Sequence, residues 1–138
     1  MTAGAALVLL GCGGSKEHRS PGQIAAERAC VARLAGIGVV DLADLGPAGV
    51  ARLARMARAL DAAAAALASR PSPSAPGRDA TAAALAAAAG AARRFLGEQR
   101  IGAPAADRTY GRLYAALAHL AQTARRAGLD GCRVAFAG

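Results

Sequence analysis

Apolar residues recur at alternating spacings of three and four between Val50 and Leu67, and this pattern constrains the fold most strongly. Such spacing places them on one side of an α-helix, as the a and d positions of nearly three heptads. The members of this seam are Val50, Leu53, Ala57, Leu60, Ala64 and Leu67. Tyr110 to Ala124 repeats the spacing. No segment alternates with period two, so the sequence predicts an all-α protein with at most a few extended residues in 134–137.

Helix-start signals predict a first helix that is capped by Ser20 and begins at Pro21. Serine is a good N-cap, Pro21 suits the first helical position, and Gln23 can complete a capping box. On this helix we expect Ile24, Val31 and Leu34 to face the core, with Cys30 beside them.

Three further breaks divide the rest of the chain. Gly46-Pro47 begins a second helix, and the Pro/Ser-rich residues 70–79 end it, with Asp79 expected to cap a third. Gly102-Ala103-Pro104 separates the third helix from the fourth, and Gly128-Leu129 is typical of a Schellman stop. Short connections between four helices predict an up-down-up-down four-helix bundle over residues 21–138.

The N-terminal segment Leu9-Leu10-Gly11-Cys12 matches a bacterial lipobox at the end of a short apolar run. The run is too short to span a bilayer as a helix but is typical of an export signal, although no basic residue precedes it. We therefore expect residues 1–11 to be a lipoprotein signal peptide that is removed. Cys12 would then carry palmitate and other acyl chains, and residues 12–20 would form a flexible tether.

The chain contains three cysteines, an odd number that the lipobox explains. Lipidation of Cys12 leaves Cys30 and Cys132, and export would place that pair in an oxidising compartment. We expect them to form a structural disulfide. The alternative is two unrelated buried thiols.

A net charge of +8 raises the question of which partner the protein binds. Lys16 is the single lysine among 17 basic residues, an Arg bias that a GC-rich genome also produces. A basic surface on a lipid-anchored protein would be attracted to anionic head groups. The charge excess can also be spread over solvated helix faces. Export and the absence of a recognisable nucleic-acid module argue against nucleic acid as the partner.

Candidate binding residues are few. Tyr110 and Tyr114 share a helix face near Arg108 and Arg112, a weak candidate site for an anionic or sugar-like ligand. The alternative is that Tyr110 fills the seam and Tyr114 packs at its rim. His119 has no second His, Asp or Glu at i±3 or i±4, so we expect no metal site or other cofactor there. No nucleophile motif, phosphate loop or carboxylate pair is present, so we expect no enzyme.

The chain resembles a known family in three features. These are the lipobox, Cys30 in the first helix and the closing Gly128-Leu129-Asp130-Gly131-Cys132. It is similar to small Ala/Arg-rich helical lipoproteins of high-GC actinobacteria. The resemblance implies a helical fold and a Cys30–Cys132 bond, and it implies no catalytic residue.

The sequence therefore predicts an extracytoplasmic, lipid-anchored helical lipoprotein, a non-enzymatic interaction or structural module of the cell envelope. Its partners would be the membrane, anionic lipid head groups or an envelope protein. One alternative is a carrier of a small ligand or metal in a pocket between helices. The other, which requires the lipobox to be spurious, is a basic nucleic-acid-binding protein.

Overall fold

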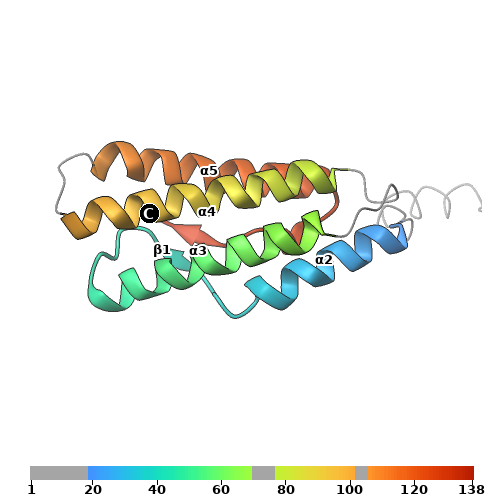
Figure 1. Ribbon diagram of the computed structural model, residues 1–138, viewed down its shortest axis with the longest axis horizontal. Coiled ribbons are helices and arrows are strands. Elements are labelled where there is room, and N and C mark those ends of the chain that lie inside the picture. The colour runs from blue at the N-terminus through green and yellow to red at the C-terminus, as the bar shows by residue number, and fades with distance from the viewer. Residues whose placement is uncertain (1–18, 70–76, 102–105) are drawn as a thin grey trace, which may run out of the picture.

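Four helices pack side by side in the computed structural model, which describes residues 19–69, 77–101 and 106–138 (Figure 1). They are α2 (Pro21–Leu34), α3 (Pro47–Ala68), α4 (Arg78–Ile101) and α5 (Ala106–Arg126). Successive helices run in alternate directions, so the start of α2 and the end of α5 lie at the same end of the molecule. The all-α, up-down-up-down four-helix bundle predicted from the sequence is confirmed.

The predicted helix ends are largely as the sequence indicated. Ser20 caps α2, and the Ser20 and Gln23 side chains complete a reciprocal capping box. After α5, Gly128 adopts a φ of 71°, and the Leu129 amide donates to the Ala124 carbonyl at 2.8 Å. This is the 6→1 hydrogen bond of a Schellman motif.

The start of α4 differs from the prediction. Asp79 is not the cap, because the helix begins one residue earlier, at Arg78. The Thr81 amide already donates to the Gly77 carbonyl at 2.9 Å. Asp79 lies inside the first turn instead, where an acidic side chain favours the helix through the macrodipole.

The core combines a few large side chains with many alanines. Its largest fully buried members include Leu53, Met56, Leu60, Leu85, Phe95, Leu113, Leu117 and Leu120. Met56, which the heptad seam omits, is completely buried. Between these large residues, Ala63, Ala88 and Ala92 are also fully buried. Small side chains at the contacts allow α3, α4 and α5 to pack closely.

The predicted inner face of α2 is confirmed for Leu34 and Cys30, which are buried, and wrong for Ile24 and Val31. Ile24 and Val31 are 39% and 44% exposed, whereas Ala26, Ala29 and Cys30 are buried. The disulfide fixes the rotation of the helix, because Cys30 must face Cys132, and this rotation leaves Ile24 and Val31 partly exposed.

The C-terminal tail folds back along the bundle (Figure 1). After α5 it forms a short 3-10 helix, η1 (Asp130–Cys132), which contacts both α2 and α5. It then pairs as β2 (Phe136–Ala137) in parallel with β1 (Val40–Asp41). The Val40 and Leu42 amides donate to carbonyls of the tail, both at 2.9 Å. The extended tail was expected, but its partner strand was not.

Candidate functional site

Cys30 on α2 and Cys132 in η1 form a disulfide, as the cysteine count predicted. Their Cα atoms are 4.9 Å apart although 102 positions separate them in sequence, and both side chains are fully buried. The bond therefore ties the first helix to the tail. On the chain-entropy model, closing a loop of this length stabilises the fold by about 4–5 kcal/mol.

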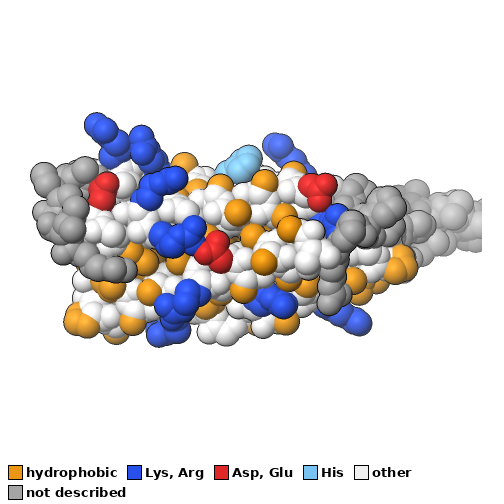
Figure 2. All heavy atoms as spheres, viewed as in Figure 1, with side chains coloured by type: hydrophobic (Ala, Val, Ile, Leu, Met, Phe, Trp, Pro, Cys, Tyr) orange, Lys and Arg blue, Asp and Glu red, His pale blue; other side chains and the backbone are white. Residues whose placement is uncertain are grey.

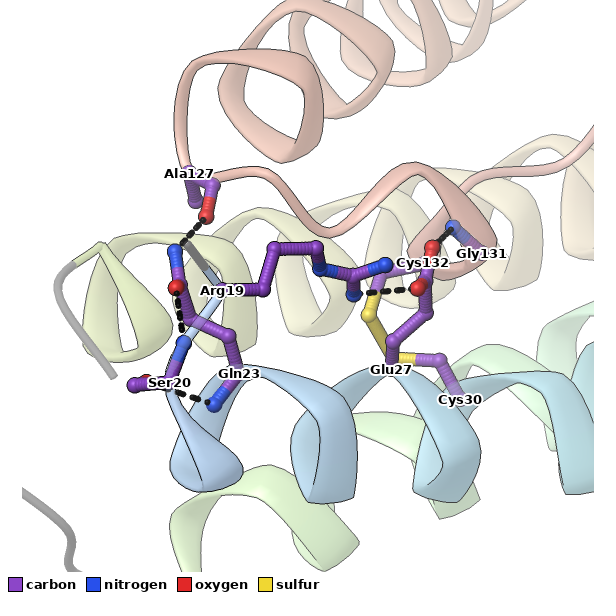
Figure 3. A network of polar contacts seen from close by, with 8 residues as sticks. All are labelled: Arg19, Ser20, Gln23, Glu27, Cys30, Ala127, Gly131 and Cys132. Atoms are coloured by element: carbon purple, nitrogen blue, oxygen red, sulfur yellow. Dashed lines mark hydrogen bonds and ion pairs between the residues drawn. A yellow bond between two sulfur atoms is a disulfide. The ribbon is translucent and has the colours of Figure 1, made fainter. Parts of the chain in front are cut away.

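Polar contacts around Glu27 reinforce that bond (Figure 3). One carboxylate oxygen of Glu27 accepts a hydrogen bond from the Gly131 amide at 2.8 Å, and the other pairs with the Arg19 guanidinium. A side chain at position 131 has no room, because its Cβ would lie 2.5 Å from Cγ2 of Val31. The backbone of η1 is thus held directly against α2.

The capping residue Gln23 makes a second link between α2 and the end of α5 (Figure 3). Its Oε1 accepts from the Ser20 amide at 3.0 Å, and its Nε2 donates to the Ala127 carbonyl at 3.1 Å. The contacts of Gln23 and Glu27 hold backbone segments together, and the two charged groups involved, Arg19 and Glu27, are paired with each other. The network therefore stabilises the fold rather than presenting a reactive group.

The predicted lipidation site, Cys12, lies outside the described residues. The described chain begins at Arg19, at the end of the bundle where α2 starts and α5 finishes (Figure 1). We call this the N-terminal end of the bundle.

The two tyrosines of the weak ligand site belong to a cluster of four rings. Tyr110 lies between Phe95 and Tyr114, with ring centroids 6.1 and 6.5 Å away. Tyr114 also packs nearly perpendicular to Phe136, with ring centroids 5.1 Å apart, and is 46% exposed. Tyr110 therefore fills the seam and Tyr114 packs at its rim.

Arg108 and Arg112, the other members of that candidate site, are both exposed. The rings already pack on one another, and their contacts account for the aromatic residues without a ligand. Ligand binding at Tyr110, Tyr114, Arg108 and Arg112 stays a prediction.

A cleft of about 460 Å³, which sequence reasoning missed, lies at the N-terminal end of the bundle between α4 and α5. Its described lining consists of Gln23, Gly77, Ala80, His119, Thr123, Arg126 and Ala127. These residues come from three distant segments, so no single motif contains them. The available signal is the spacing of His119, Thr123 and Arg126, which places them on one face of α5.

His119 lies on the surface, as expected for a histidine with no second potential metal ligand one turn away on its helix. Its Nε2 is 3.4 Å from Oγ1 of Thr123. In the part of the chain that the structure describes, no group of three or more His, Cys, Asp or Glu side chains could hold a metal ion.

Basic side chains are distributed over several helices rather than gathered in one patch on the face seen in Figure 2. Some are neutralised locally: Arg93 pairs with Asp61 across α3 and α4, and Arg78 pairs with Asp79. This distribution agrees with a charge excess spread over solvated helix faces.

Among the described helices, none combines the length and the apolar character needed to cross a membrane. Comparison with protein-family models, with curated proteins and with solved structures found no match to this chain.

Proposed function

We propose that the chain is exported, lipidated at Cys12 and held at an extracytoplasmic membrane surface. There the bundle acts as a non-enzymatic interaction or structural module of the cell envelope. The observation that carries this proposal is the buried Cys30–Cys132 disulfide, because disulfides form and persist in oxidising compartments. The resemblance to small helical lipoproteins supports the same interpretation.

The geometry of the bundle supports the anchoring step. Arg19 follows Cys12 by seven residues, and such a segment spans at most about 25 Å when fully extended. The N-terminal end of the bundle would then face the bilayer. Arg125 and Arg126 are exposed at this end, where they would be attracted to anionic head groups.

Metabolic labelling with a palmitate analogue tests the proposal. The wild-type chain is expected to be labelled and to fractionate with membranes, whereas a Cys12→Ala variant should be unlabelled. Cys30→Ser serves as the control, because it removes a cysteine without removing the acyl acceptor. A wild-type chain that incorporates no label would contradict the proposal.

A carrier of a small ligand is the second candidate function, and the cleft between α4 and α5 favours it. Native mass spectrometry of the protein isolated from the envelope distinguishes the two. A carrier would retain a reproducible bound mass, and a purely structural module would be observed at the mass of the lipidated chain.

A further inference from the structure

We propose that the cleft at the N-terminal end of the bundle binds a phosphate-type oxyanion, held by Arg126 with His119 and Thr123 as hydrogen-bonding partners. Binding of a phosphate at this site does not require lipidation of the chain. If the phosphate belongs to a lipid head group, the proposal also rests on the proposed function.

The three side chains form one wall of the cleft. Positions 119, 123 and 126 are related as i, i+4 and i+7 on α5, so they lie on the same face. The imidazole and the hydroxyl are adjacent, since Nε2 of His119 lies 3.4 Å from Oγ1 of Thr123. His119, Thr123 and Arg126 therefore line the same cleft from one helix face.

The wall of the cleft carries the positive charge of Arg126. No carboxylate occurs in the described lining of the cleft. Arg126 forms no ion pair with a carboxylate in the described ranges, in contrast to Arg19 and Arg93. Arg126 also lines a second hollow, whose lining includes the carboxylates of Glu27 and Asp130. A planar guanidinium that is not paired with a carboxylate can bind a phosphate through two parallel N–H donors.

The opposite wall is the start of α4, represented by Gly77 and Ala80. The first amides of a helix have no carbonyl partner within it, and their partial positive charge also favours an anion. The Asp79 carboxylate lies in the same first turn and offsets part of this positive charge, but its side chain is 91% exposed and is not part of the described lining.

The remaining lining gives the cleft a fixed shape. A Cβ at Gly77 would lie 2.7 Å from that of Ala127, so this glycine allows the start of α4 to approach the end of α5. Gln23 is held by its bonds to Ser20 and Ala127. A volume of about 460 Å³ is within the usual range for small-molecule sites and is larger than the volume of a water molecule. It has room for a phosphate ester rather than a bare ion alone.

Two sources offer the same chemistry: a glycerophospholipid head group or a free phosphate ester. The experiment uses the full chain with Cys12→Ser, so that no acyl chain contributes. It measures binding of glycerol phosphate by calorimetry and cosedimentation with phosphatidylcholine vesicles, with and without phosphatidylglycerol. Arg126→Gln is compared with Arg125→Gln, which removes the same charge from the next residue, outside the cleft.

Loss of a charged hydrogen-bonding partner should weaken glycerol phosphate binding about tenfold in Arg126→Gln and less than about twofold in Arg125→Gln. Thr123→Val should also weaken it, while the thermal unfolding of each variant stays unchanged. Binding to phosphatidylglycerol vesicles that is lost with Arg126→Gln would identify the lipid as the source. Glycerol phosphate binding without vesicle binding would identify a soluble ester.

An absence of glycerol phosphate binding would overturn the proposal, as would equal losses of glycerol phosphate binding in Arg125→Gln and Arg126→Gln. Equal losses would mean diffuse attraction by surface charge. Because the chain used here is unlipidated, these outcomes are independent of the labelling experiment on Cys12.

Discussion

At the scale of single residues, Glu27 links parts of the chain that are far apart in sequence. Its carboxylate accepts from the Gly131 amide while pairing with Arg19, and both Arg19 and Glu27 are largely shielded from water. Hydrogen bonds to charged groups contribute more than neutral ones, particularly where solvent is excluded. A single side chain on α2 thus holds the backbone of η1 and the residue that precedes the cap.

We expect Glu27→Ala to lower the free energy of unfolding by about 1–3 kcal/mol, because it leaves the Gly131 amide without its acceptor. Urea unfolding of the oxidised protein measures the change. Asp61→Ala is the matched control, since it also removes a carboxylate paired with an arginine, but at a position about half exposed. Exposed pairs contribute roughly 0–1 kcal/mol. Equal effects of the two substitutions would show that the Glu27 contacts add nothing specific.

At the scale of helices, alanine determines how closely α3, α4 and α5 approach. Ala63 on α3 and Ala88 and Ala92 on α4 are fully buried, and α3 with α4 is the most extensive helix pair. An alanine contributes little apolar area, but it loses no side-chain entropy on folding and favours helix strongly. The bundle therefore depends on close backbone approach as well as on its leucines.

Enlarging one of these alanines should be costly. We expect Ala88→Leu to destabilise the protein by about 1–3 kcal/mol, because a close-packed contact has no space for the added atoms. Ala87→Leu, at the exposed neighbouring position, should change stability by less than about 0.5 kcal/mol. Thermal unfolding followed by circular dichroism gives both values. A neutral Ala88→Leu would mean that the interface is looser than its burial indicates.

Elements whose signals are local were predictable from the sequence. The 3-4 spacing of leucines identified α3 and α5, the Ser20–Gln23 pair identified the start of α2, and Gly128-Leu129 identified the stop after α5. Cysteine parity identified the disulfide. In each case a short stretch of residues, or a count, carries the physical requirement.

Features that depend on packing between distant segments were not predictable. Ile24 and Val31 were wrongly assigned to the inner face of α2, because the bond between Cys30 and Cys132 sets the rotation of that helix. Two-residue strands such as β1 and β2 are too short to show a period. The cleft is formed by residues from α5, from the start of α4 and from α2, which the fold alone brings together.

At the scale of the whole molecule, α2 is joined to the bundle by two surfaces, α3 and the tail segment η1. The disulfide and the Glu27 contacts all belong to the second surface. The helices α3, α4 and α5 share the remaining core, with α4 packed on both neighbours. The molecule therefore consists of α3, α4 and α5 with α2 held against them by its contact with α3 and by the disulfide-linked tail.

Reduction of the disulfide should affect these parts unequally. Amides of α2 and of residues 129–137 are expected to lose protection from hydrogen exchange first, because reduction breaks the covalent bond that joins these two segments. Amides in the middle of α3, α4 and α5 should stay protected under the same conditions. Exchange measured by mass spectrometry with and without reductant gives the comparison. A uniform loss of protection would mean that α2 is an inseparable part of the bundle.

We propose that the three cysteines have two roles: Cys12 is a lipid anchor, and Cys30 and Cys132 form the buried disulfide. Peptide mass spectrometry of the protein from bacterial membranes, digested without reductant after thiol alkylation, tests it most directly. We predict an N-terminal peptide that begins at an acylated Cys12, and a single cross-linked species containing Cys30 and Cys132. Alkylated Cys30 and Cys132, together with an N-terminal peptide that begins at Met1, would contradict it.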